Sequence, residues 1–252
     1  MRVPRNMQTL LALVGADAPT AYRDLIIAHP DVVAVTACRY KTPPLLQQRI
    51  TTTALEQEII AAALSIRSDA KIPFWEAIFA ACLQVGKCSD SLLDAALFHS
   101  GPGDFTRISA SDLESDGLKA VVAGGQSNVG LASRIELAHA APHHLALMDF
   151  HCAVNMENTE IVAAVCRRLM PHGFLLLDSG DSYHACGIAL LAAKERSEFL
   201  AKSLFFAPIV DAAYVAHQLL QPMSSIRIST GGSRTKCPEV LFVEGGKHRK
   251  DR

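Results

Sequence analysis

The sequence predicts a mixed α/β protein with a helix-rich first part and a more regular second part. Hydrophobic residues make up 50% and charged residues 19% of the 252-residue chain, which is typical of a globular protein that buries a core without disulfide support. In the first part apolar residues recur at helical spacing, whereas from residue 144 onwards short apolar runs alternate with helical segments. We therefore expect a helical α/β unit at 1–118, a second unit at 119–245 packed with it in one compact domain, and a basic tail at 246–252.

One buried strand and five helices are expected in the first part, and the first two helices are Met7–Val14 and Ala21–Ala28, the second of which ends before Pro30. Asp31–Tyr40 is rich in β-branched residues and predicts a strand. Thr53–Ile66 repeats apolar residues with the period of a helix. Pro73–Leu83 and Ser89–Phe98 are expected as two further helices, with Ser89 as the N-cap of the second.

Turn residues and a glycine-rich loop separate the two parts. His99–Phe105 contains two glycines and a proline and predicts a turn. Leu118–Ala123 is a candidate strand, Gly124–Gly130 (GGQSNVG) a loop and Leu131–Ala141 a helix. The loop lacks the Lys-Ser/Thr of a P-loop and does not match GxGxxG, but a loop that enters a helix can bind an anion. A small-molecule α/β enzyme with its site near Gly125 is therefore one hypothesis.

The second part reads as an alternation of strands and helices. The expected strands are His144–Val154, Phe174–Leu177, Tyr183–Leu191, Ser225–Ser229 and Val240–Glu244, and the expected helices are Asn158–Leu169, Ala192–Leu204 and Asp211–Leu220.

Composition excludes some classes of protein. A formal net charge of −1 gives no sign of a histone-like nucleic-acid binder, although a local basic groove is compatible with it. The seven cysteines include no CxxC pair, which argues against a structural zinc site or a disulfide framework and favours a cytoplasmic location. No apolar run reaches the ~18 residues of a membrane span, so we expect no membrane association.

The first candidate site follows the apolar run LALM. Asp149 and His151 share a strand face by the period of two, and a carboxylate in such a setting needs solvent, a partner or a cation. The pair suits a divalent metal, and the imidazole shifts the preference from magnesium towards manganese or zinc. The alternative is an aspartate that caps a turn, next to a histidine with an ordinary hydrogen-bond partner.

A second pair of polar residues follows the turn Asp178-Ser179-Gly180. Ser182 and His184 have the same i, i+2 relation, and both side chains can donate hydrogen bonds to a phosphate. The alternative is that Ser182 closes the turn and His184 packs against Tyr183.

Four charged residues follow further along the chain. Asp211 is either a third acidic metal ligand or a favourable charge at a helix N-terminus. Arg227 lies inside the short strand SSIRIST, where a half-buried guanidinium usually needs an anion. Arg234 and Lys236 follow in a polar loop, so the three cations are candidates for holding a triphosphate. The alternative is an ordinary solvated hairpin loop.

The order of these motifs resembles the archaeo-eukaryotic primase superfamily and, more loosely, the primase-polymerases within it. Members have an acidic hhhDx(D/E) strand, then an SxH strand, then an hD motif followed by a strand that contains an arginine. Here these are LMDFH with Asp149, SYH with Ser182 and His184, VD with Asp211, and IRIS with Arg227.

The resemblance extends over roughly residues 120–244 and implies an RRM-like catalytic half behind the helical α/β unit. It implies a metal-dependent nucleotidyltransferase, with Mn²⁺ or Mg²⁺, that uses nucleoside triphosphates to synthesise or extend a primer on a single-stranded nucleic-acid template, in DNA replication and with a possible partner protein. The implied catalytic and metal-binding residues are Asp149, His151 and Asp211, and the implied nucleotide-binding residues are Ser182, His184, Arg227 and Lys236.

One departure from the superfamily pattern concerns His151. It stands where the second acid of the first motif is expected, and a neutral imidazole supplies less negative charge to a two-metal centre than a carboxylate does. The alternative function is therefore a catalytically degenerate primase fold that binds nucleic acid or a partner.

Overall fold

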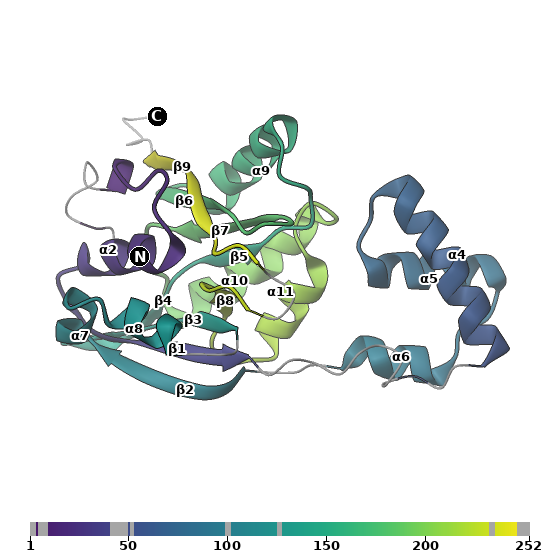
Figure 1. The fold of residues 1–252 in the computed structure, drawn as a ribbon, viewed down its shortest axis with the longest axis horizontal. Coiled ribbons are helices and arrows are strands. Elements are labelled where there is room, and N and C mark those ends of the chain that lie inside the picture. Colours follow the sequence, from purple (N-terminus) through teal and green to yellow (C-terminus); the bar gives the residue numbers. More distant parts are fainter. Residues whose placement is uncertain are drawn as a thin grey trace. The chain divides into compact units, whose positions relative to one another are not determined.

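The chain divides into two compact units in the computed structural model, which describes residues 4, 10–40, 50, 53–98, 102–124, 128–231 and 235–245. The first unit combines residues 1–41 with 102–252, and the second comprises residues 42–101 (Figure 1). This division differs from the expected boundary at residue 118. The physical reason is strand pairing: the strand that ends at Tyr40 pairs with strands that lie after residue 101, so the intervening helices form a unit of their own.

A five-stranded antiparallel sheet forms one layer of the first unit. Its order is β2-β1-β3-β4, and β8 pairs with the start of β3. The strands are β1 (Val32–Tyr40), β2 (Pro102–Ser109), β3 (Val129–Leu137), β4 (Ala140–His144) and β8 (Ser225–Arg227).

A four-stranded antiparallel sheet forms a second layer, in the order β5-β7-β6-β9. Its strands are β5 (Leu147–Asp149), β6 (Gly173–Asp178), β7 (Tyr183–Gly187) and β9 (Glu239–Gly245). β7 pairs with β5 on one side and with β6, its hairpin partner, on the other. β9 pairs with the remaining side of β6. The fold is therefore mixed α/β, as the sequence predicts.

The two faces of the four-stranded sheet bury different cores. Leu147, Leu175 and Cys186 belong to the core that also contains side chains of the five-stranded sheet. Their strand neighbours Met148 and Leu176 belong to a second core, with side chains of the helices on the outer face. This alternation follows from the period of two in a strand, and it explains why these runs are apolar throughout.

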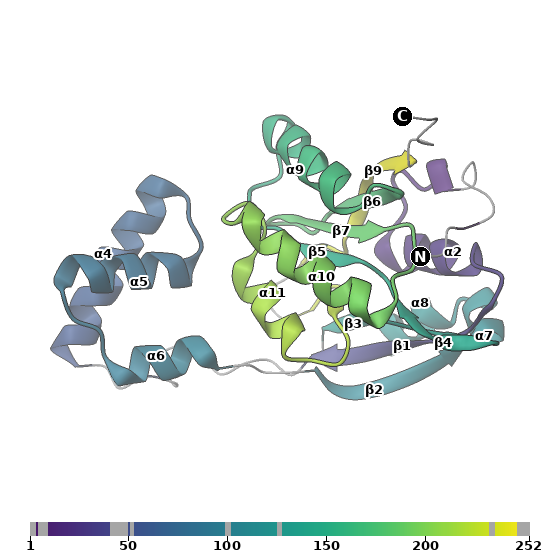
Figure 2. The ribbon, with the colours of Figure 1, turned by 180° about the vertical axis from the view of Figure 1, so that it is seen from behind.

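Helices cover both cores of the first unit (Figure 2). The first core is completed by α2 (Ala18–Ile27), α7 (Ala110–Glu114) and α8 (Gly117–Ala123), and the second by α9 (Met156–Leu169), α10 (Ala193–Ser203) and α11 (Ala212–Leu219), with the short 3₁₀ turn η1 (Leu204–Phe206) after α10.

The second unit is a small helical unit with its own core. It consists of α4 (Ala54–Ala70), α5 (Phe74–Val85) and α6 (Asp90–Leu97). Ser89 caps α6 through a hydrogen bond from Leu92 N to its hydroxyl, which confirms the expected N-cap. The core of this unit contains only its own residues, including Ile59, Ile78 and Leu92.

Two elements around the glycine-rich loop differ from the prediction. Residues 131–141 were expected as a helix, but they lie in β3 and the start of β4. Pairing with β1 on one side and with β4 and β8 on the other outweighs the helical preference of Leu131–Ala132, because sheet context decides such ambiguous runs. Conversely, Leu118–Ala123 was expected as a strand but lies in the helix α8.

The described residues contain no helix that is both long and apolar enough to cross a membrane. The expected basic tail at 246–252 and the centre of the glycine-rich loop, residues 125–127, lie outside the described residues.

Candidate functional site

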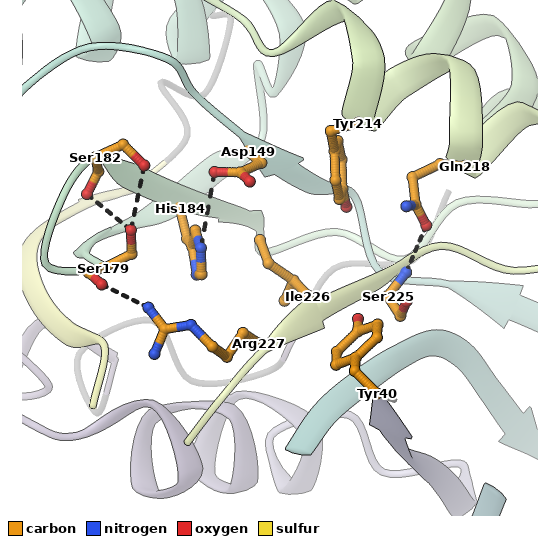
Figure 3. Close-up of a pocket in the computed structure, with 10 residues that line it drawn as sticks. All are labelled: Tyr40, Asp149, Ser179, Ser182, His184, Tyr214, Gln218, Ser225, Ile226 and Arg227. Atoms are coloured by element: carbon orange, nitrogen blue, oxygen red, sulfur yellow. Dashed lines mark hydrogen bonds and ion pairs between the residues drawn. The ribbon is translucent and has the colours of Figure 1, made fainter. Parts of the chain in front are cut away.

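A pocket of about 210 Å³ opens at the end of the core between the two sheets (Figure 3). The four-stranded sheet contributes the polar side chains at the pocket's centre. Asp149 follows Leu147 on one face of β5, and His184 precedes Cys186 on the same face of β7. The face that is apolar further along the strands therefore becomes polar where the strands end, and this creates the site.

Strand register brings Asp149 and His184 together. The two residues are direct partners across the antiparallel β5–β7 pair, and His184 Nε2 lies 3.7 Å from Asp149 Oδ1. The imidazole is almost fully buried, and the side chain of Asp149 is 29% exposed. A predicted metal-site residue and a predicted phosphate-site residue thus belong to one cluster.

Burial, and secondarily the positive charge of Arg227, lowers the pKa of His184 to about 3. The ring is therefore neutral at physiological pH and carries one N–H donor and one acceptor nitrogen. A phosphate next to the ring would raise its pKa, because an adjacent negative charge favours the imidazolium form.

Arg227 enters the pocket from the other sheet, on β8. Its guanidinium donates to the carbonyl oxygens of Ser179 at 2.5 Å, Ser229 at 2.5 Å and Lys236 at 3.0 Å. Burial lowers the pKa of Arg227, and the negative charge of Asp149 opposes that shift. Because the three carbonyls are neutral, they fix the side chain in place without cancelling its charge.

Ser182 lies in the β6–β7 hairpin, at the same end of the pocket as Arg227 (Figure 3). The Ser182 carbonyl accepts from Ser179 N at 2.9 Å and from Ser179 Oγ at 3.0 Å. These bonds close the hairpin and leave two serine hydroxyls, 3.3 Å apart, at the pocket wall. Ser182 therefore combines the turn-closing role and the pocket position that the sequence left as alternatives.

Three predicted site residues, His151, Lys236 and Asp211, do not line the pocket. His151 lies beyond the end of β5, where its backbone N–H donates to the Ile209 carbonyl at 2.8 Å. Phe150 continues the strand alternation, because it packs in the second core like Met148, but the pocket lining includes Asp149 and not His151. Lys236 forms an ion pair with Asp178 at 2.5 Å and reaches Arg227 only through its carbonyl oxygen.

Asp211 lies next to Asp149 without lining the pocket. Its backbone N–H donates to the Asp149 carbonyl at 3.1 Å, and its Oδ1 caps α11 by accepting from Tyr214 N at 2.8 Å. Both carboxylates contribute to raising the pKa of the Tyr214 phenol, after the larger effect of its burial. The Asp211 side chain is therefore a helix cap whose charge lies near Asp149.

The donor set limits which ions fit. Within the described residues, no group of three or more His, Cys, Asp or Glu side chains gathers as a metal cage. Mg²⁺ commonly binds through one or two carboxylates and completes its shell with water and substrate phosphates. Asp149, which lines the pocket, is a ligand of the type that such an ion takes, whereas Asp211 lies outside the pocket lining.

Six pocket residues were not predicted from the sequence: Tyr40, Ser179, Tyr214, Gln218, Ser225 and Ile226. Tyr214 and Gln218 have the i, i+4 spacing of one helix face, and this spacing of two polar side chains in a mostly apolar helix was the available signal. Tyr40 carried no such signal, because its place in the pocket depends on pairing between strands far apart in the sequence.

Taken together, these features define a mixed α/β domain with a polar pocket between two antiparallel sheets. A family model described as archaeo-eukaryotic primase 1D-like (AEP-like) matches residues 109–238, just over half of the 252 residues, and the chain belongs to this family. The matched segment contains every pocket residue except Tyr40. No curated protein and no solved structure matches the chain.

Proposed function

We propose that this protein is a metal-dependent nucleotidyltransferase of the primase-polymerase type, which synthesises or extends a primer on a single-stranded nucleic-acid template. The observation that carries the proposal is the convergence of Asp149, His184 and Arg227 on one pocket in a chain of this family. A carboxylate next to a fixed cation and neutral hydrogen-bond donors suits a triphosphate that bridges to a metal ion.

The roles of the pocket residues follow from their charges. Arg227 binds the β- and γ-phosphate oxygens, and the Ser182 hydroxyl and the neutral His184 ring donate hydrogen bonds to the same group. Asp149 and Asp211 hold Mg²⁺ or Mn²⁺. When bound, such ions stabilise the attacking and leaving oxygens of the displacement. The 3′-hydroxyl of the primer loses its proton to solvent water, its oxygen forms a bond to the α-phosphorus, the bond from that phosphorus to the α–β bridging oxygen breaks, and pyrophosphate leaves.

Asp149→Asn provides the decisive test, with Glu160→Gln on the exposed side of α9 as a control that removes the same charge away from the pocket. Primer synthesis and extension are measured with labelled nucleoside triphosphates, a single-stranded template and a manganese or magnesium titration. We expect Asp149→Asn to lose about a hundredfold or more in rate with little change in melting temperature, since several kcal/mol of transition-state stabilisation depend on the metal. If the unmodified protein binds no triphosphate at any metal concentration, the proposed site is wrong.

A second candidate function is a primase fold that binds nucleic acid or a partner protein without synthesis. Two observations favour this alternative. His151 stands at the position of the second acid, and Asp211 Oδ1 already accepts a hydrogen bond as the cap of α11. It predicts template binding without metal-dependent synthesis in the same assay, and equal binding by the protein with and without Asp149→Asn.

A further inference from the structure

The pocket has two ends that differ in chemistry. Arg227, Ser179 and Ser182 lie at one end, and Tyr40 and Tyr214 lie at the other, together with Gln218 and Ser225 (Figure 3). Among the residues that the structure describes, no charged side chain lines the second end, whereas the first contains a fixed cation. A ligand that fills both ends therefore has an anionic part joined to a neutral part.

Tyr40 comes from the first stretch of the chain and reaches the pocket because of a glycine. Gly130 on β3 lies against the tyrosine ring: a Cβ atom at position 130 would be 2.5 Å from Tyr40 Cε2 and 2.8 Å from its hydroxyl oxygen. Any side chain at position 130 would therefore displace the ring. The Tyr40 N–H also donates to the Asn128 carbonyl at 2.9 Å, which fixes the end of β1 beside β3. The glycine-rich segment thus positions an aromatic side chain, a role that none of the sequence motifs indicates.

The neutral end carries groups that suit a ring with polar edges. Burial raises the pKa values of Tyr40 and Tyr214, so both phenols stay protonated and can donate or accept hydrogen bonds. Gln218 Oε1 accepts from Ser225 N at 2.8 Å, which orients the side chain and leaves its amide N–H groups as donors. Aromatic rings beside an amide are a common setting for a nucleobase and sugar, because every base can stack on an aromatic face.

We propose that Tyr40, Tyr214 and Gln218 form a subsite for the nucleoside part of a triphosphate, and that Tyr40 is an aromatic contact of that part. The inference rests on the proposed function, since it assumes that the phosphate part lies against Arg227. It goes beyond the family assignment because Tyr40 lies outside the matched residues 109–238.

Two probes separate the two ends of the pocket: a nucleoside triphosphate, and inorganic tripolyphosphate, which lacks the nucleoside. Binding of each probe in the presence of Mn²⁺ is measured by calorimetry for the unmodified protein, Tyr40→Ala and Arg227→Met. We expect Tyr40→Ala to weaken binding of the nucleoside triphosphate about tenfold or more and to leave tripolyphosphate binding unchanged, because only base and sugar contacts are lost. Arg227→Met is expected to weaken binding of both probes. Val33→Ala, at an exposed position of the same strand, serves as the control and is expected to change neither.

Gly130→Ala tests the same subsite without removing the aromatic side chain. We expect it to weaken nucleoside triphosphate binding by displacing the Tyr40 ring, and to have no further effect in the Tyr40→Ala background, because both changes act on one contact. Thermal melting identifies a variant that fails to fold. Tyr40→Leu, which retains apolar bulk but no aromatic face, then replaces Tyr40→Ala and should likewise weaken binding of the nucleoside triphosphate alone.

The outcomes distinguish the two proposals. If Tyr40→Ala and Gly130→Ala bind the nucleoside triphosphate as tightly as the unmodified protein, the nucleoside subsite is wrong and the proposed function survives. Equal weakening of both probes by Tyr40→Ala would also overturn the subsite. If the unmodified protein binds neither probe, the proposed function fails, and the subsite fails with it.

Discussion

The two units of this chain are built on different kinds of contact. In the first unit, residues from both ends of the sequence share a core, as Leu25 and Leu175 do. In the helical unit, the core comes from a single stretch between Ile50 and Ala95. Every pocket residue belongs to the first unit. The comparison teaches that the site depends on pairing between distant strands, whereas the helical unit depends on local packing.

The largest expected effects come from substitutions that create a cavity in each core. Leu175→Ala and Ile78→Ala both remove a fully buried side chain, and each should lower the unfolding free energy of its own unit by about 2–5 kcal/mol. Only Leu175→Ala should also weaken triphosphate binding, because Leu175 packs in the core that ends at the pocket. Hydrogen exchange resolved by peptide, together with binding measurements, checks both statements. Equal loss of binding in Ile78→Ala would show that the units are energetically coupled.

Acid should affect the first unit before the helical unit. Burial lowers the pKa of His144 to about 4, and burial also lowers the pKa of His29. Below pH ~6.5 the unfolded chain binds protons that the folded unit excludes. The free energy of unfolding of the first unit is therefore highest above that pH and decreases as the pH falls. Residues 53–98 contain no histidine.

The measurement for this prediction is denaturant unfolding between about pH 6.5 and 4.5, followed unit by unit. Each excluded proton should contribute a slope of about 1.4 kcal/mol per pH unit. His144→Gln should reduce the pH slope of the first unit's unfolding free energy by the contribution of about one proton, since the glutamine does not titrate. An unchanged slope in that variant would contradict the assignment.

A smaller effect is expected from a pair of thiols in the helical unit. Cys82 Sγ lies 2.9 Å from Cys88 Sγ, and Cys88 is exposed between α5 and α6 while Cys82 is buried in α5. Oxidised glutathione should convert the pair into a disulfide, with loss of two free thiols and release of reduced glutathione. The closed loop should stabilise the helical unit by about 2 kcal/mol. Mass spectrometry and thiol titration follow the reaction, and Cys88→Ser should abolish it; a mixed disulfide as the final product would count against the pair.

The smallest effect on the first unit is expected from removing the helical unit altogether. Tyr40 and Pro102 are partners in the β1–β2 register, so a short Asn-Gly turn in place of residues 42–101 can close a hairpin. Among the described residues, no residue of this segment belongs to the cores of the first unit. We expect a melting temperature within a few degrees of that of the unmodified first unit and similar triphosphate binding, measured by circular dichroism and calorimetry. A shortened chain that fails to fold would refute the independence of the two units.

Local sequence patterns predicted much of the second half of the fold. The helices α9 and α11 and the strands β6 and β9 lie where apolar periodicity placed them. The same reasoning failed at residues 131–141, because leucine and alanine suit either a helix or a buried strand, and only the partner strands decide between them.

Chemical patterns in the sequence likewise identified part of the pocket. Asp149, Ser182, His184 and Arg227 were predicted as site residues, and the structure brings all four to one pocket. Charged and polar side chains at the ends of apolar strands are a signal that sequence carries by itself, because burying such groups without a partner costs free energy.

Tertiary structure alone decided the rest. Only the structure shows that Asp149 lines the pocket while His151 does not, and that Asp211 Oδ1 caps α11. The approach of Tyr40 to Gly130 joins residues that are 90 positions apart, and no local pattern encodes a contact at that separation. The sequence by itself therefore determined which side chains are available for chemistry, and the pairing of distant strands decided which of them meet.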